Sequence, residues 1–148
     1  MNRHSPWRDA AERHPDVKIG LAKIAPLRGA WITTENVIVL DVDLDQANCN
    51  ATLAHELAHI DLKHHTHQAP AKWFAVRWER EADNLACDRL LDNVDEIAEA
   101  MALHPQNLDM ASDYLEVPAD VLWRRLTRLT NAEKLLIVER LDRIDRAC

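Results

Sequence analysis

The apolar and polar positions follow a two-residue period in the first third of the chain and a helical period after it. Short alternating or uniformly apolar runs stand at 17–21, 30–33 and 37–40, and the last of them reads VIVL between polar neighbours. Side chains that alternate between two faces at every second residue are typical of β-strands. The runs therefore predict a small sheet of two or three strands between residues 16 and 42.

The helical period begins in the mid-forties, with an apolar stripe at Leu53, Leu57 and Ile60. Such spacing places these side chains on one face of a helix. Asn48 and Asn50 precede the stripe and are the expected candidates for its N-terminal cap. The first long helix is therefore expected to carry the sequence HELAH.

Further helices are expected behind it, after a loop at Thr66–Ala71 that contains a proline. Thr130 and Glu133 have the spacing of a capping box, which predicts the start of the last helix. Pro118 suits the first turn of the helix before it. The expected helices are 72–91, 94–103, 107–115, 118–129 and 132–146.

This pattern of a small early sheet and many later helices predicts an α+β fold. A chain of 148 residues with 47% hydrophobic content is long enough for one core and too short for two large ones. We expect a core domain at residues 1–104 that holds the sheet, with a helical, helix-turn-helix-like subdomain at residues 105–148 packed on it.

Charge and cysteine content narrow the function classes. The formal charge is -7, from 25 acidic and 18 basic residues, which disfavours broad binding to nucleic acid or to an anionic membrane. The first fifteen residues lack the apolar core of a secretory signal, and no apolar run is long enough to span a bilayer. Cys49, Cys87 and Cys148 form no CxxC pair. We expect a cytoplasmic protein with reduced thiols.

HELAH has the HExxH arrangement of zincin metallopeptidases. His55 and His59 stand four residues apart, so on a helix both imidazoles project from one face about 6 Å apart and can share one metal ion. Glu56 lies about 100° round the helix from His55, which places its carboxylate beside the metal. In this arrangement the glutamate acts as the base toward water at the metal.

A catalytic zinc needs a third protein ligand, and two candidates compete. His65 would serve in the longer histidine motif, but position 62 is Leu where that motif has the glycine that turns the chain. On an unbroken helix His65 points about 120° away from His59. Glu79, in the sequence EREAD of the next helix, is therefore the expected ligand, whereas Glu81 on the same helix is expected to be solvated.

The surroundings of Glu79 support a site shared by two helices. Asp83 follows it by one turn and is placed to accept the Nδ1 proton of a ligand histidine. Small residues on both helices would let the backbones approach closely. They are Ala54, Ala58, Ala82 and Ala86.

The sequence also suggests environments for several other side chains near the motif. His64, His65 and His67 are expected to form a solvated helix end. In an alternative, His64, His65 or Tyr114 stabilises the oxyanion of the reaction. Among the remaining residues, Trp73 and Trp78 are expected to be core anchors, and Cys87 a small buried side chain.

The combination of HELAH, ExxAD about 20 residues later and a helical tail resembles the ImmA/IrrE metallopeptidases. The likeness runs through TLAHELAHIDLKH (52–64), EREADNLACDRLL (79–91) and DYLEVPADVLWRRLTRL (113–129). The resemblance implies a short, ImmA-like protein, bacterial or phage-encoded, that cleaves a helix-turn-helix repressor and so relieves repression. It also marks His55, His59 and Glu79 as ligands of Zn2+, or alternatively Mn2+, and Glu56 as the catalytic base.

The expected activity is thus zinc-assisted hydrolysis of a peptide bond, with the strand VIVL aligning the substrate by strand addition. A rival reading is a non-catalytic, metal-stabilised protein that sequesters a regulator. A third makes 110–129 a DNA-binding helix-turn-helix. We disfavour it because Arg124, Arg125 and Arg128 are opposed by nearby carboxylates.

Overall fold

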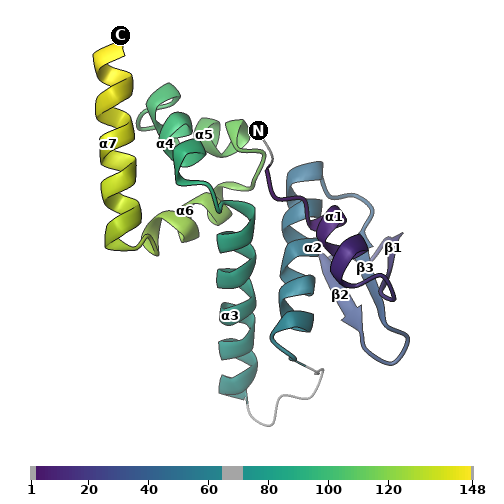
Figure 1. Cartoon of the computed structure of the whole chain (residues 1–148). Helices are drawn as coiled ribbons and strands as arrows, with labels where there is room; N and C mark the ends of the chain where they lie inside the picture. Colours follow the sequence, from purple (N-terminus) through teal and green to yellow (C-terminus); the bar gives the residue numbers. More distant parts are fainter. Residues whose placement is uncertain (1–2, 65–71, 148) are drawn as a thin grey trace. The chain divides into compact units, whose positions relative to one another are not determined.

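The computed structural model in Figure 1 describes residues 3–64 and 72–147. These residues separate into two compact units. The sheet unit comprises residues 4–90, and the helical unit comprises residue 3 together with residues 91–147. The fold class is α+β, as expected from the sequence. The expected loop at 66–71 lies outside the described residues.

Three strands form the sheet of the sheet unit, in the region expected from the sequence: β1 (Lys18–Ala22), β2 (Gly29–Ile32) and β3 (Val37–Asp41). The strand order is β1-β3-β2, with β1 parallel and β2 antiparallel to β3. The central strand β3 is the apolar run VIVL, and its Ile38 and Leu40 are fully buried. Val37 and Val39, on the other face of this strand, are partly buried, which fits an apolar sequence without polar alternation.

Two long helices of this unit, α2 (Gln46–Asp61) and α3 (Lys72–Leu90), pack side by side (Figure 1). Leu53 and Leu57 of α2 join Ile38 and Leu40 of β3 in the core, so the apolar stripe faces the sheet as expected. The N-terminal cap of α2 is Asp45, whose side chain accepts a hydrogen bond from the backbone of Asn48. The expected cap at Asn48 or Asn50 is therefore wrong by three or five residues.

A further helix, α1 (Pro6–Arg13), is absent from the sequence expectation. Its start has a recognisable pattern: Ser5 caps the helix through its hydroxyl, and Pro6 occupies the first turn. Ala10 of α1 is buried in the same core as Leu53.

The approach of the sheet to α2 depends on a glycine. A Cβ atom added at Gly29 of β2 would lie 2.6 Å from Cγ2 of Thr52 on α2, which is closer than real side chains approach one another. The backbone of β2 at Gly29 therefore packs directly against α2 at Thr52. This contact brings the edge of the sheet next to the sequence HELAH.

The helical unit contains α4 (Val94–Leu103), α5 (Leu108–Tyr114), α6 (Ala119–Thr127) and α7 (Asn131–Ala147). All four helices lie where the sequence predicts them, within a few residues. The capping box is confirmed, because the backbone N–H of Thr130 donates to Glu133 and that of Glu133 donates to the hydroxyl of Thr130. Pro118 is the cap of α6 rather than a residue of its first turn.

The division between the units falls at residue 90, before α4, whereas the expected domains divide after residue 104. α4 packs with α5 and α7. As a statement about separately folding domains, the division at residue 104 stays a prediction. In the described part of the chain, no helix has the length and apolar content needed to cross a bilayer.

Candidate metal centre

The packing of α2 on α3 rests on alanines, as the sequence predicts. Small side chains at a helix contact allow the two backbones to approach at the short end of the usual spacing. All four alanines are at most 4% exposed: Ala54, Ala58, Ala82 and Ala86. Side chains from the two helices can therefore meet at a single point.

Three potential metal ligands converge at that point, namely His55 and His59 from α2 and Glu79 from α3. Nε2 of His55 lies 3.0 Å from Oε2 of Glu79, and Nε2 of His59 lies 3.0 Å from Oε1 of Glu79. The two Nε2 atoms are also 3.0 Å apart. The spacing predicted from the sequence thus brings these three residues together in the structure.

This donor set fits a metal ion. Zinc bonds of about 2.0–2.1 Å in a tetrahedron place neighbouring ligand atoms roughly 3.3 Å apart, and one ligand atom from each of the three residues lies within 4.8 Å of the others. The side chain of Glu79 is 61% exposed, whereas those of His55 and His59 are 18% and 12% exposed. The group can therefore hold a metal ion that remains open to water and substrate on the Glu79 side.

The electrostatics of the cluster indicate that it needs a positive charge. Burial disfavours the charged form of His55, but hydrogen bonds to Asp83 and Glu79 outweigh it and raise the pKa of His55 to about 10. Hydrogen bonds from His55 and His59 hold the pKa of Glu79 well below its usual range. A site that attracts a proton this strongly also attracts a cation that can replace the proton.

Asp83 occupies the position predicted for it. Its Oδ1 lies 2.8 Å from Nδ1 of His55. A carboxylate this close to Nδ1 favours the tautomer in which Nε2 of His55 carries the lone pair and faces the other ligands.

Glu56 lies beside the ligands on α2 and is 8% exposed. Burial raises its pKa, although the neighbouring His55 and His59 act in the opposite direction. The backbone N–H of Trp31, on β2, donates a hydrogen bond to the Glu56 carboxylate. Glu56 is thus a buried carboxylate with a raised pKa, held between the sheet edge and the histidines, and such a group is suited to accept a proton at neutral pH.

His64 differs from its expectation. It is 5% exposed rather than solvated, its Nδ1 lies 3.0 Å from Nδ1 of His59, and its Nε2 lies 3.1 Å from Oε2 of Glu81. Both ring nitrogens are engaged, which leaves neither for an oxyanion. His65 lies outside the described residues, and Tyr114 belongs to α5 of the helical unit.

The side chain of Glu81 is 36% exposed and also contacts both His64 and Arg77. Helix α2 ends at Asp61, before the histidines expected at its end, and Lys63 has a left-handed backbone with φ of 58°. The sequence contained one usable signal for Glu81, namely its four-residue spacing from Arg77, but no signal for the contact with His64.

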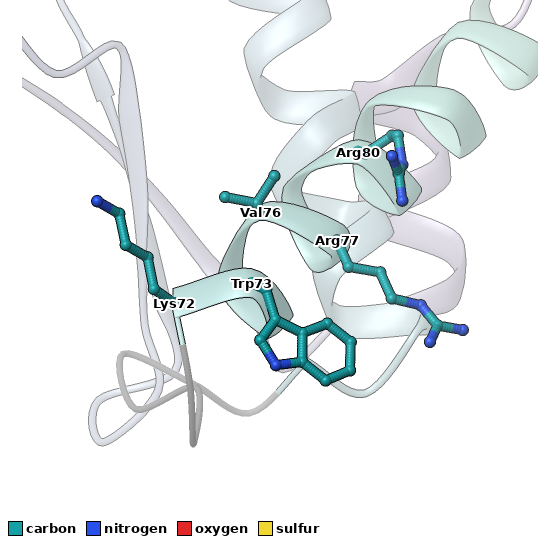
Figure 2. Close-up of a pocket in the computed structure, with 5 residues that line it drawn as sticks. All are labelled: Lys72, Trp73, Val76, Arg77 and Arg80. Carbon is teal, nitrogen blue, oxygen red and sulfur yellow. The ribbon is translucent and has the colours of Figure 1, made fainter.

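A cavity of about 910 Å³ lies along the first half of α3 (Figure 2). Trp73, expected in the core, is instead 60% exposed in this cavity, and Val76 beside it is 59% exposed. Among the described residues, three basic side chains also line it: Lys72, Arg77 and Arg80. Trp78, the other expected anchor, is partly buried and stacks on His64 with ring centroids 5.0 Å apart.

Comparison with protein-family models, curated proteins and solved structures finds no match to this chain. The chemistry of the centre is therefore argued from its geometry and donor set.

Proposed function

We propose that this protein is a zinc-dependent endopeptidase of the zincin type that cleaves a helix-turn-helix repressor, as its resemblance to the ImmA/IrrE metallopeptidases implies. The observation that carries the proposal is the convergence of His55, His59 and Glu79 next to the buried Glu56. Three protein ligands and one open side are the composition of a catalytic rather than a structural zinc site.

The donor set favours zinc among the common ions. Two imidazoles and one carboxylate suit zinc, while manganese, the second candidate, prefers more oxygen ligands. When bound, the ion supplies a Lewis acid that polarises a carbonyl oxygen and lowers the pKa of water to about 7. The remaining chemistry belongs to side chains of this chain.

Glu56 is the proposed proton carrier. Its burial holds its pKa above the usual range, so the carboxylate accepts a proton from the attacking water and later gives it to the departing amine nitrogen. The hydrogen bond from the Trp31 backbone fixes the carboxylate, and Asp83 fixes the ring of His55. Positioning of this kind keeps the base within reach of the reacting atoms.

The strand proposed to align the substrate is β2, not VIVL. β3, which contains VIVL, is paired on both sides, whereas β2 is an edge strand of the described sheet. The N–H of Trp31 in β2 points to Glu56 rather than to β3. An extended peptide added along this edge would therefore lie beside the proposed base.

The cavity on α3 supports a substrate with acidic and apolar side chains. Lys72, Val76, Glu79 and Asp83 fall on one stripe of the helix, so the cavity adjoins the metal centre. Its three cations attract carboxylates, and Trp73 and Val76 offer apolar contact. A long nucleic acid fits less well because the carboxylates of the centre would repel it.

The test is cleavage by zinc-loaded protein of repressors encoded near its gene, followed by mass spectrometry of the products. New peptide termini should form with the wild type and not with Glu56→Gln. Relief of repression by Glu56→Gln in cells, with the repressor left intact, would replace proteolysis by sequestration of the regulator. An intact repressor with zinc-loaded wild type would overturn this substrate.

A further inference from the structure

The end of α2 has a backbone geometry that determines where His64 lies. The helix ends at Asp61, and the left-handed residue Lys63 reverses the chain. The N–H of His64 donates to the carbonyl of His59 over 2.9 Å, and that of Lys63 donates to the carbonyl of Ile60 over 3.0 Å. These two bonds define a Schellman motif, in which the second residue after the cap packs on the last turn.

The same motif ends α5 in the helical unit, where its side chains are ordinary. Glu116 is the left-handed residue there, with φ of 60°, and the N–H of Val117 donates to the carbonyl of Ser112 over 3.1 Å. Val117, the second residue after the cap, is apolar and 5% exposed, as is usual in this motif. At the end of α2 the same position holds His64, so a hydrogen-bonding side chain stands where an apolar one is usual.

The partners of His64 determine its proton positions. An ionised Glu81 carboxylate only accepts hydrogen bonds, so Nε2 of His64, 3.1 Å away, must carry a proton. In a neutral imidazole the other nitrogen then accepts, and Nδ1 of His64 faces Nδ1 of His59 at 3.0 Å. The proton between them therefore sits on Nδ1 of His59, which leaves the lone pair of His59 on Nε2, toward His55 and Glu79.

We propose that His64 and Glu81 form a positioning relay for the metal ligand His59. The relay runs from Glu81 through Nε2 and Nδ1 of His64 to Nδ1 of His59, and it presents Nε2 of His59 to the metal. Asp83 positions His55 in the same way by direct contact, because its Oδ1 lies 2.8 Å from Nδ1 of His55. A carboxylate thus positions each ligand histidine: Asp83 acts on His55 directly, and Glu81 acts on His59 through the imidazole of His64.

Two neighbours hold the relay in place. Trp78 stacks on the His64 ring with an interplanar angle of 13°, and Nε of Arg77 donates to the other oxygen of Glu81 over 2.8 Å. The relay rests on the proposed metal centre and not on peptidase activity, so its test uses metal binding.

The test is zinc affinity by competition with a fluorescent chelator for three proteins: wild type, His64→Leu and His64→Gln. Leucine places at position 64 the kind of apolar side chain that Val117 provides at the end of α5 and removes the hydrogen bonds, so we expect an unchanged or higher Tm without metal and a Kd for zinc raised roughly 10–100-fold. Glutamine keeps an acceptor oxygen for the Nδ1 proton of His59, so its Kd should lie between those of the other two proteins.

The matched control is His14→Ala, which removes a histidine that contacts Asp61 in the same unit and not the metal ligands; its zinc Kd should equal that of the wild type. Nitrogen-15 NMR of the zinc-loaded wild type should show protons on Nδ1 of His59 and on Nε2 of His64. His64→Leu with wild-type zinc affinity, or the opposite tautomer of His64, would overturn the relay alone. Failure of the wild type to bind zinc would overturn the relay and the metal centre together.

Discussion

Two polar clusters join α2 to its neighbours in the sheet unit, and they differ in how their charges are matched. One is the metal centre of His55, His59 and Glu79. The other surrounds Asp61, four residues before His65 and at the end of α2, where Arg13, His14 and Arg89 contact its carboxylate at distances of 2.6–3.0 Å.

The charge of the Asp61 carboxylate is already balanced by neighbouring side chains. Although burial of Asp61 opposes ionisation, hydrogen bonds from Arg13 and Arg89 hold its pKa at about 2, and guanidinium groups carry a permanent charge. The metal centre instead brings ring nitrogens and a carboxylate together, and only a proton or a metal ion can supply the missing charge. The Asp61 cluster thus contains its own cations, whereas the candidate metal centre has a place for an exchangeable one.

Glu56→Gln should have the largest effect on function while leaving both clusters intact. The amide has the shape of the carboxylate but cannot carry the proton, so peptide cleavage should fall roughly 10²–10⁴-fold. Zinc content by plasma mass spectrometry should remain one ion per chain. Residual cleavage within tenfold of the wild type would show that another group acts as the base.

Substituting one carboxylate in each cluster, Glu79 in the candidate metal centre and Asp61 in the other, tests the comparison most directly. Glu79→Ala removes one of three ligands, so its zinc Kd should rise by more than the roughly 100-fold that loss of an outer contact can cause. Asp61→Asn should lower the free energy of unfolding by about 1–3 kcal/mol, because Arg13 and Arg89 lose a charged partner, and leave the zinc Kd unchanged. Chelator competition and urea unfolding measure the two quantities, and a reversed pattern would contradict the distinction.

Proton release on zinc binding sharpens the same comparison. With its pKa raised to about 10, His55 is protonated in the metal-free protein at pH 8, and zinc must displace about one proton. Calorimetric titration in buffers of different ionisation enthalpy counts that proton. Zinc binding that releases none at pH 8 would mean that the cluster is already neutral.

The same raised pKa predicts a pH dependence of stability without metal. The stabilisation from charged His55 is fully present below the unfolded pKa of about 6.5 and is lost as the pH rises through the folded value of about 10. The lowered pKa of Asp61 acts at the other end: its contribution is present above about pH 4 and is lost as the pH falls toward 2. Urea unfolding of metal-free protein should show a decline at each end, and Asp61→Asn should reduce only the acid one, because Glu79 and Glu133 also have lowered pKa values.

Charge reversal at the α3 cavity should have a smaller effect. Arg80→Glu places a carboxylate among the cations that are proposed to receive acidic substrate side chains. Surface charge pairs contribute about 0.2–1 kcal/mol, so KM for an acidic peptide should rise by a few fold, with kcat and the zinc Kd unchanged. Equal KM values for acidic and neutral peptides with the wild type would remove the cavity from the proposal.

The parts of the site that the sequence could predict depend on helix periodicity. The four-residue spacing of His55 and His59, and the common face of Glu79 and Asp83, follow from 3.6 residues per turn. The alanines that allow close packing follow the same rule. Strand order has no such signal, so periodicity correctly located VIVL as a strand but could not tell that it is the central one.

The relay could not be predicted because its turn lacks the usual marker. A Schellman motif usually has glycine at its left-handed position, whereas here that residue is Lys63. Without the glycine, nothing in the sequence marks the turn at Lys63, so His64 is expected at a solvated helix end. The contact of His64 with Glu81 on α3 has no sequence signal for the same reason.

Lys63→Gly should have the smallest effect, and it separates the fold of the turn from the chemistry it supports. A non-glycine residue in the left-handed region is strained by about 1–2 kcal/mol, and glycine recovers part of this while adding freedom to the unfolded chain. We expect a gain of about 0.5–1 kcal/mol in the free energy of unfolding, a similar gain for Glu116→Gly at the equivalent turn of α5, and no change in zinc Kd for either protein. A Lys63→Gly protein that is stabilised but binds zinc more weakly would show that the Lys63 side chain itself takes part in the centre, because the backbone that positions His64 on His59 would still be in place.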